Sequence, residues 1–202
     1  MPLNMFLALS LFAFVASITP GPNNLMLLAS GVNFGFIRTI PHMLGVGFGF
    51  VFMILCVGVG IRQLFEAVPQ LYLVLKVVSV VYMLWLAWKI ANAGPIKTSE
   101  TGAGAKPMTF LAAAAFQWVN PKAWAMALTA DALYTVPAAY MLTLGIMAAV
   151  FGAINIPSIA CWTGFGVGLR DLLQDSSRVR VFNYAMAALL LASLVPVLMG
   201  LE

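Results

Sequence analysis

The chain has 202 residues, of which 63% are hydrophobic and 8% are charged, and its mean hydropathy is +1.02. Soluble domains are about 45–50% apolar and about 25% charged, so these figures exclude a soluble globular domain. The net charge of +4 comes from ten basic and six acidic residues. Most basic residues lie at the ends of apolar runs, which indicates membrane topology and not nucleic-acid binding. The sequence therefore predicts an integral membrane protein in contact with lipid.

Six apolar runs follow one another along the chain. A bilayer core about 30 Å thick needs roughly 20 apolar residues per helix. Each run is continuously apolar, whereas the strands of a membrane barrel alternate every second residue. We therefore predict an all-α protein, a single transmembrane domain over residues 1–202 with six membrane-spanning helices. The six runs are 3–31, 41–61, 70–91, 108–130, 137–168 and 181–200.

The first run is interrupted at residues 19–22 (TPGP). No basic residue precedes the run and no small-residue cleavage site ends it, so we expect a span and not a cleaved signal peptide. Pro20 and Pro22 have no backbone N–H, so the carbonyls of Ala16 and Ile18 lose their helical donors. These carbonyls need other partners inside the membrane.

The same interruption predicts a half-helix that begins within the membrane. Gly21 allows the chain to pause, and Pro22 suits the first position of a new helix. Asn23 and Asn24 then lie in its first turn, close to Thr19. The free N–H groups and the positive end of the helix dipole would attract an anion such as a carboxylate.

Paired glycines mark the second and fifth runs. Gly45 and Gly49 lie four residues apart, as do Gly164 and Gly168. This spacing lets helix backbones approach closely in membranes, so we expect both pairs to lie at helix contacts.

Residues 92–107 form a Gly/Ser/Thr/Lys-rich segment that divides the chain into halves, 1–91 and 108–200. Each half contains three runs, and an odd number of spans inverts the second half relative to the first. The sequence therefore predicts two inverted three-helix repeats joined by the linker 92–107.

The basic residues predict the orientation of the chain. If the N-terminus lies outside, the first, third and fifth loops are cytoplasmic and carry seven basic residues at their edges. The second loop then carries only Arg62 and the fourth carries none, so both termini are expected outside and the linker inside. The seven cytoplasmic residues are Arg38, Lys89, Lys97, Lys106, Arg170, Arg178 and Arg180.

The fourth run repeats the interruption at residues 118–121 (WVNP). Asn120 is a good N-cap, Pro121 is a natural first helical residue, and the carbonyl of Gln117 loses its helical donor. Lys122 follows directly, although a lysine at the bilayer centre costs about 2.5–3.5 kcal/mol. It would either orient a carboxylate or hold the break in place; snorkelling toward the outer surface is the alternative.

Paired proline-interrupted segments in two halves of a chain are typical of the binding site of an inverted-repeat transporter. Free N–H groups and free carbonyls a few ångströms apart suit a zwitterion such as an amino acid. The alternative is a pair of proline kinks whose polar groups are satisfied by neighbouring helices and water. The expected substrate-binding residues are Thr19, Pro20, Gly21, Pro22, Asn23, Asn24, Gln117, Asn120, Pro121 and Lys122.

Titratable groups are few in the runs, and no carboxylate lies deep in any of them. The candidates for proton coupling are Asp131, at the outer edge of the fourth run, and His42, at the cytoplasmic end of the second. His42 is a candidate because histidine changes charge near neutral pH. A helix-end acid and an interfacial imidazole are the alternatives. Cys56 and Cys161 have no metal-ligand spacing, so we expect no metal and no cofactor.

Several segments together resemble the LysE/RhtB superfamily of amino-acid exporters. The likeness covers nearly the whole chain in the right order, and it is strongest to the RhtB branch, which includes cysteine/O-acetylserine and homoserine/threonine exporters. The segments are 18–24 (ITPGPNN), Gly35 with Arg38, 82–89 (YMLWLAWK), 105–107 (AKP) and 116–122 (FQWVNPK).

The resemblance implies a multi-pass protein of the bacterial inner membrane with six helices, and with the orientation predicted from the basic residues both termini are periplasmic. It also implies export of small neutral amino acids or their derivatives by a secondary transporter, driven by the proton gradient, and no enzymatic activity. A homodimer is one assembly that such an apolar bundle permits. Two other functions are an intramembrane thiol or electron carrier that uses Cys56 and Cys161, and a membrane scaffold without transport.

Overall fold

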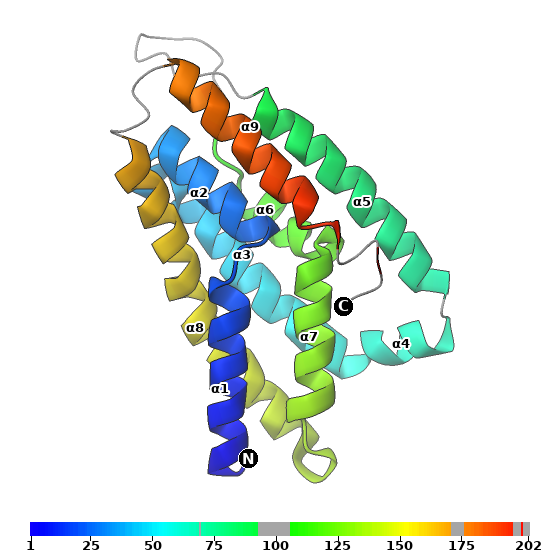
Figure 1. The fold of residues 1–202 in the computed structure, drawn as a ribbon. Helices are drawn as coiled ribbons and strands as arrows, with labels where there is room; N and C mark the ends of the chain where they lie inside the picture. Colours follow the sequence, from blue (N-terminus) through cyan, green and yellow to red (C-terminus); the bar gives the residue numbers. More distant parts are fainter. Residues whose placement is uncertain (69, 93–105, 171–175, 196–198, 200–202) are drawn as a thin grey trace.

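A computed structural model describes residues 1–68, 70–92, 106–170, 176–195 and 199. The described residues form helices and short turns, with no strand among them (Figure 1). The helices are α1 Leu3–Ile18, α2 Pro22–Phe34, α3 Phe36–Cys56, α4 Arg62–Ala67, α5 Gln70–Ala91, α6 Phe110–Phe116, α7 Pro121–Tyr134, α8 Tyr140–Leu169 and α9 Ser176–Ala192. Three short helical turns, Val57–Ile61, Gln117–Val119 and Pro137–Ala139, join them.

Long apolar helices confirm the all-α membrane class. Among the described residues, Phe36–Ile61, Leu73–Ala91 and Pro137–Arg170 are each long and apolar enough to cross a bilayer. The pair α1 and α2 passes the same test as one span that is bent by 51° at its break. The arrangement of six spans in two inverted repeats stays a prediction. Residues 93–105 of the predicted linker lie outside the described residues.

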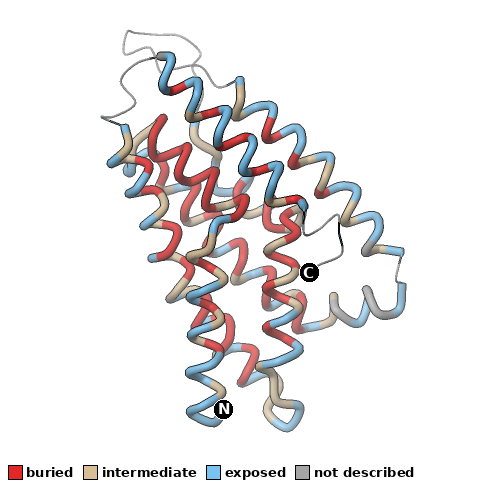
Figure 2. The backbone as a smooth tube through the Cα atoms, viewed as in Figure 1, coloured by how far each residue is buried: buried red, intermediate tan, exposed pale blue. Residues whose placement is uncertain are grey.

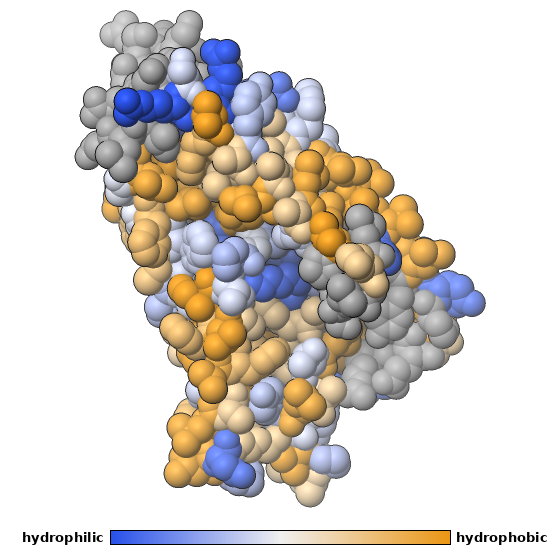
Figure 3. Space-filling model, viewed as in Figure 1, coloured by the Kyte–Doolittle hydropathy of each residue, from blue (hydrophilic) through white to orange (hydrophobic). Residues whose placement is uncertain are grey.

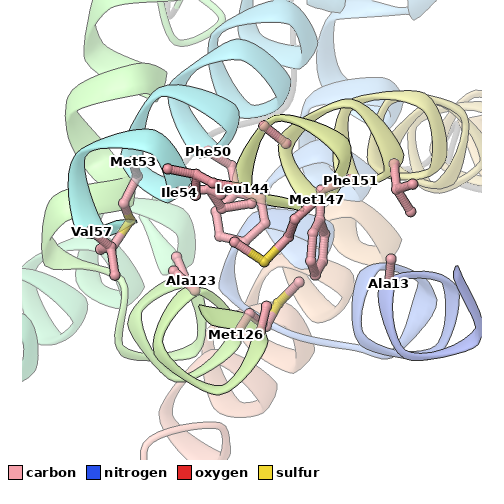
Figure 4. Close-up of a cluster of buried hydrophobic side chains, with 14 of the residues drawn as sticks. Ala13, Phe50, Met53, Ile54, Val57, Ala123, Met126, Leu144, Met147 and Phe151 are labelled. Carbon is pink, nitrogen blue, oxygen red and sulfur yellow. The ribbon is translucent and has the colours of Figure 1, made fainter. Parts of the chain in front are cut away.

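The largest cluster of buried apolar side chains joins α1, α3, α7 and α8. Figure 4 shows Phe50 and Met53 of α3 facing Leu144, Met147 and Phe151 of α8, with α7 packed below them. The Phe50 and Phe151 rings meet edge to face with centroids 5.4 Å apart, a favourable aromatic geometry. A second cluster lies between α2, α5 and α9, and α5 and α9 run side by side (Figure 1).

Glycines allow the closest helix contacts. A Cβ on Gly45 or Gly49 would collide with α6, at Phe110 and Ala114, so the predicted contact of this pair is confirmed. The prediction for Gly164 and Gly168 is wrong, because both face open space. Gly166, midway between them, packs instead on the Leu28 backbone of α2, because it lies on the opposite face of α8 from Gly164 and Gly168.

The outer surface is strongly apolar. Leu73, Val77 and Val81 of α5 are more than half exposed, as are Leu7 and Leu11 of α1. Figure 2 shows exposed residues along the outer faces of α5 and α9, while α2 is buried almost throughout. Such a surface is too large and too continuous for a soluble monomer, and it fits contact with lipid.

Candidate functional site at two helix breaks

The first break separates α1 from α2 within three residues. Thr19 leaves the helix with φ −64° and ψ 144°, and Gly21 is fully extended at φ −176° and ψ 178°. Pro22 then begins α2 as its first helical residue, as predicted. Gly21 occupies the N-cap position and has no side chain to cap the new helix.

Side chains donate hydrogen bonds to the carbonyls that lose their helical donors at this break. The Ala16 carbonyl accepts a hydrogen bond from the Thr19 hydroxyl at 3.1 Å, and the Ile18 carbonyl accepts one from the indole N–H of Trp162 at 3.0 Å. Asn24 donates from its amide to the Ser17 and Thr19 carbonyls, each at 2.8 Å. The expectation that free carbonyls await a ligand ammonium is therefore wrong, because the protein pairs them itself.

The second break is tighter and is satisfied locally. Residues Gln117–Val119 form a 3-10 turn, and the Asn120 N–H donates to the Gln117 carbonyl at 3.3 Å. The Asn120 side chain accepts from the Lys122 N–H at 3.2 Å and so caps α7, which begins at Pro121. Both predictions for this break, the cap and the first residue, are confirmed.

The two breaks contact one another across about a hundred residues of sequence. The Lys122 ammonium donates to the Thr19 carbonyl at 2.9 Å, to the Thr19 hydroxyl at 2.8 Å and to the Pro20 carbonyl at 3.4 Å. Beside it, the amides of Asn23 and Gln117 pair reciprocally at 2.8 and 3.2 Å. Lys122 thus lies over the first break and does not snorkel away from it.

A small cavity lies between the breaks, with a volume of about 30 Å³. This is room for about one or two water molecules, which is too little for an amino acid. Two buried polar atoms of its lining, Ser17 Oγ and Asn155 Oδ1, have no hydrogen-bond partner. Buried polar groups are nearly always paired, so two orphans in one cavity indicate a place for a polar ligand.

All ten predicted site residues lie at this junction. Six of them line the cavity: Gly21, Pro22, Asn23, Asn24, Asn120 and Lys122. Thr19, Pro20 and Gln117 contact these residues through hydrogen bonds, and Pro121 is buried at the start of α7. Figure 3 shows a hydrophilic patch midway along the molecule, with apolar surface above and below it.

Sequence reasoning missed the residues that α8 contributes. Asn155 and Trp162 reach the breaks from this helix, and Ser17 is the last buried residue of α1. Asn155 lies two residues before Pro157, inside an apolar run, so a buried amide near a proline was the available signal. A pattern along one helix could not show which break that amide faces.

The two candidates for proton coupling lie away from the cavity. His42 is 2% exposed and lines a different, larger cavity. Asp131 is buried in the last turns of α7, where the Tyr140 hydroxyl lies 2.7 Å from its carboxylate. The structure therefore separates both residues from the junction of the breaks.

The two cysteines are free thiols on different helices. Cys56 ends α3 and Cys161 is exposed on α8, and neither lines the cavity between the breaks. The described residues contain no group of three or more His, Cys, Asp or Glu side chains that could hold a metal. This geometry gives a thiol carrier no support.

Comparison with known proteins identifies relatives over nearly the whole chain. The family described as "LysE type translocator" matches residues 14–199. The chain is 30% identical over 185 residues to a cysteine/O-acetylserine efflux protein of Escherichia coli O139:H28 (strain E24377A / ETEC), covering 89% of this chain and 90% of the relative. Proteins of the same description from Escherichia coli (strain K12) and Shigella sonnei (strain Ss046) are also 30% identical, with the same coverage. No solved structure matches the chain.

Proposed function

Because this chain belongs to the LysE type translocator family, we propose that it is a secondary transporter that exports small neutral amino acids or their derivatives across the bacterial inner membrane. The family consists of translocators and not of enzymes. Relatives described as cysteine/O-acetylserine efflux proteins support a neutral amino-acid substrate. The predicted inverted repeats, the periplasmic termini, the proton coupling and a homodimer are parts of this proposal.

One observation supports the site most directly: Lys122 of the second break is hydrogen-bonded to the carbonyl and hydroxyl of Thr19 in the first. A substrate carboxylate can replace these partners, because the uncapped start of α2 presents N–H groups and a positive dipole end beside the ammonium. The substrate ammonium then has Ser17 Oγ and Asn155 Oδ1 as acceptors, both without partners in this structure.

The small volume of this cavity fits one stage of an alternating-access cycle. About 30 Å³ cannot hold an amino acid, so substrate binding requires the two breaks to separate. One pair of helix contacts fits the predicted repeats, since α3 packs on α6 as α8 packs on α1. Exchange of the two predicted halves relates these two contacts.

Proton coupling is assigned to Asp131 and His42, as the sequence predicts. Both side chains are buried, at 1% and 2% exposed, and both lie outside the junction of the breaks. A proton on either residue would therefore act at a distance from the two breaks.

Transport assays on an Asn155→Leu variant test the proposal. Labelled neutral and basic amino acids are offered to proteoliposomes with and without an imposed pH gradient. We expect gradient-dependent flux of neutral amino acids, with flux lowered at least about tenfold in the variant. The thermal stability of the variant should change little, because the loss of an unpaired buried polar atom offsets the larger volume of leucine. If the variant keeps the wild-type flux, the substrate does not bind at Asn155 and the binding site lies elsewhere. If the folded wild type transports no amino acid, the proposed transport function is wrong.

A further inference from the structure

A second and much larger cavity opens at the end of the bundle that carries Lys89 and Lys106. Its volume is about 380 Å³, within the range of about 300–1,000 Å³ that small-molecule sites occupy. Its walls come from α2, α3, α5, α9 and the segment 106–112. Helix α2 links the two cavities, because Asn24 lines the first and Ser30 the second, about 9 Å apart by the helical rise.

The polar groups of this cavity favour a zwitterion. Lys89 and Lys106 supply positive charge, and the described lining contains no acidic side chain. His42 is 2% exposed and neither of its ring nitrogens has a hydrogen-bond partner. Asn33 uses its amide N–H to bind the Ala29 carbonyl at 2.7 Å, so its side-chain oxygen is oriented away from that bond and can accept another.

An aromatic and aliphatic wall completes the cavity. Tyr82 and Trp85 lie with ring centroids 5.3 Å apart, and the Lys89 ammonium lies 5.0 Å from the Trp85 ring centroid. Met26 and Leu86 add apolar surface on neighbouring helices. The cation is therefore held above a wall on which an apolar side chain can pack.

We propose that this cavity is a waiting site for the amino-acid substrate before it reaches the breaks, an inference that rests on the proposed function. The substrate carboxylate binds Lys89 and Lys106, and its ammonium binds the unprotonated nitrogen of His42 and the Asn33 oxygen. Its side chain packs on Tyr82 and Trp85. The site thus selects neutral amino acids with a free carboxylate, and it explains a buried histidine that has no partner within the protein.

The test compares a Lys89→Gln/Lys106→Gln double variant with Lys76→Gln, a control on α5 outside both cavities. Equilibrium binding of the labelled amino acid that the wild type transports best is measured in detergent, and transport is measured in proteoliposomes. We expect Kd and KM to rise about tenfold in the double variant, with the maximal rate retained, because charge-assisted bonds to the carboxylate are lost. The corresponding amino-acid amide has no carboxylate. Its inhibition constant as a competitor should therefore be the same in the double variant and in the wild type.

Unchanged Kd and KM in a transporting protein would overturn the waiting site alone. An equal loss of affinity for the amide would also overturn it, because the lysines would then act on the structure and not on the carboxylate. If the wild type transports no amino acid, the proposed function fails and the waiting site fails with it. The thermal stability of both variants, whose lysines are replaced by an uncharged polar side chain, identifies any loss of folding.

Discussion

Helices α2 and α7 both begin with proline after a break, but the hydrogen-bond partners of the two breaks lie at different distances along the sequence. At the second break, the Asn120 backbone and side chain satisfy neighbours within three residues. At the first break, the Ile18 carbonyl accepts from Trp162, and the Thr19 carbonyl accepts from Lys122 as well as from nearby Asn24. Trp162 and Lys122 both lie more than a hundred residues away along the chain.

This difference assigns the two breaks different parts in a transport cycle. A locally satisfied break keeps its geometry when helices move, so it can carry Lys122 as a fixed donor. When α7 and α8 move away, the first break loses the donors Lys122 and Trp162 and keeps only local bonds such as that from Asn24 to the Thr19 carbonyl. The first break is therefore the one that a substrate can occupy, because its polar groups need new partners in the open state.

Removal of the Lys122 ammonium should have the largest effect on this arrangement. In Lys122→Met, the Thr19 carbonyl and hydroxyl both lose a charged donor, and a substrate carboxylate loses its cation. We expect amino-acid flux in proteoliposomes to fall about a hundredfold. Lys76→Met is the matched control, and Lys122→Arg should retain part of the flux. Wild-type flux in Lys122→Met would contradict a role of this residue in transport.

Loss of the distant partner from α8 should have an intermediate effect. Trp162→Phe keeps an aromatic ring but leaves the Ile18 carbonyl without its indole donor. We expect the free energy of unfolding to fall by about 1 to 3 kcal/mol, the cost of an unpaired polar group in an apolar environment. Chemical unfolding in detergent micelles measures this change. Trp88→Phe, at an exposed position of α5, is the control; equal effects of the two changes would show that the hydrogen bond contributes nothing.

Removal of the local cap should have the smallest effect. Asn120→Ala takes away the side chain that accepts from the Lys122 N–H, and loss of such a cap costs about 1 kcal/mol. Asn120→Ser should recover most of this stability, since serine also caps helices well. The same unfolding measurement applies. If the free energy of unfolding fell more in Asn120→Ala than in Trp162→Phe, the local cap would contribute more to stability than the distant donor, which contradicts this comparison.

The candidate site shows how far reasoning along the chain extends. The prolines, Gly21 and Asn120 could be interpreted one by one, because each acts on its own backbone and its immediate neighbours. The pairing of Asn23 with Gln117 joins residues 94 apart, and no local rule specifies it. The same holds for the freed carbonyls, for which the sequence left two readings, open or satisfied by neighbours, and which are bound by Thr19, Trp162 and Asn24.

Glycine spacing gives a similar lesson for helix packing. The Gly45 and Gly49 pair lies at a contact with α6, whereas in α8 the contact residue is Gly166 and not the flanking pair. Both sets have the same four-residue spacing, so the spacing identifies a face of small residues. Which face meets another helix depends on where that helix lies, and that is decided by the packing of α2 against α8.

The sequence by itself determined the membrane class, the helical content, the positions of both breaks and the family, since each depends on composition, on proline chemistry or on motifs read in order. Only the tertiary structure decided which groups meet. Lys122 lies over Thr19, Asn155 Oδ1 and Ser17 Oγ remain unpaired beside a small cavity, and His42 belongs to a separate one. The physical reason is that hydrogen bonds and cavities form between side chains close in space, and helices far apart along the chain bring them together.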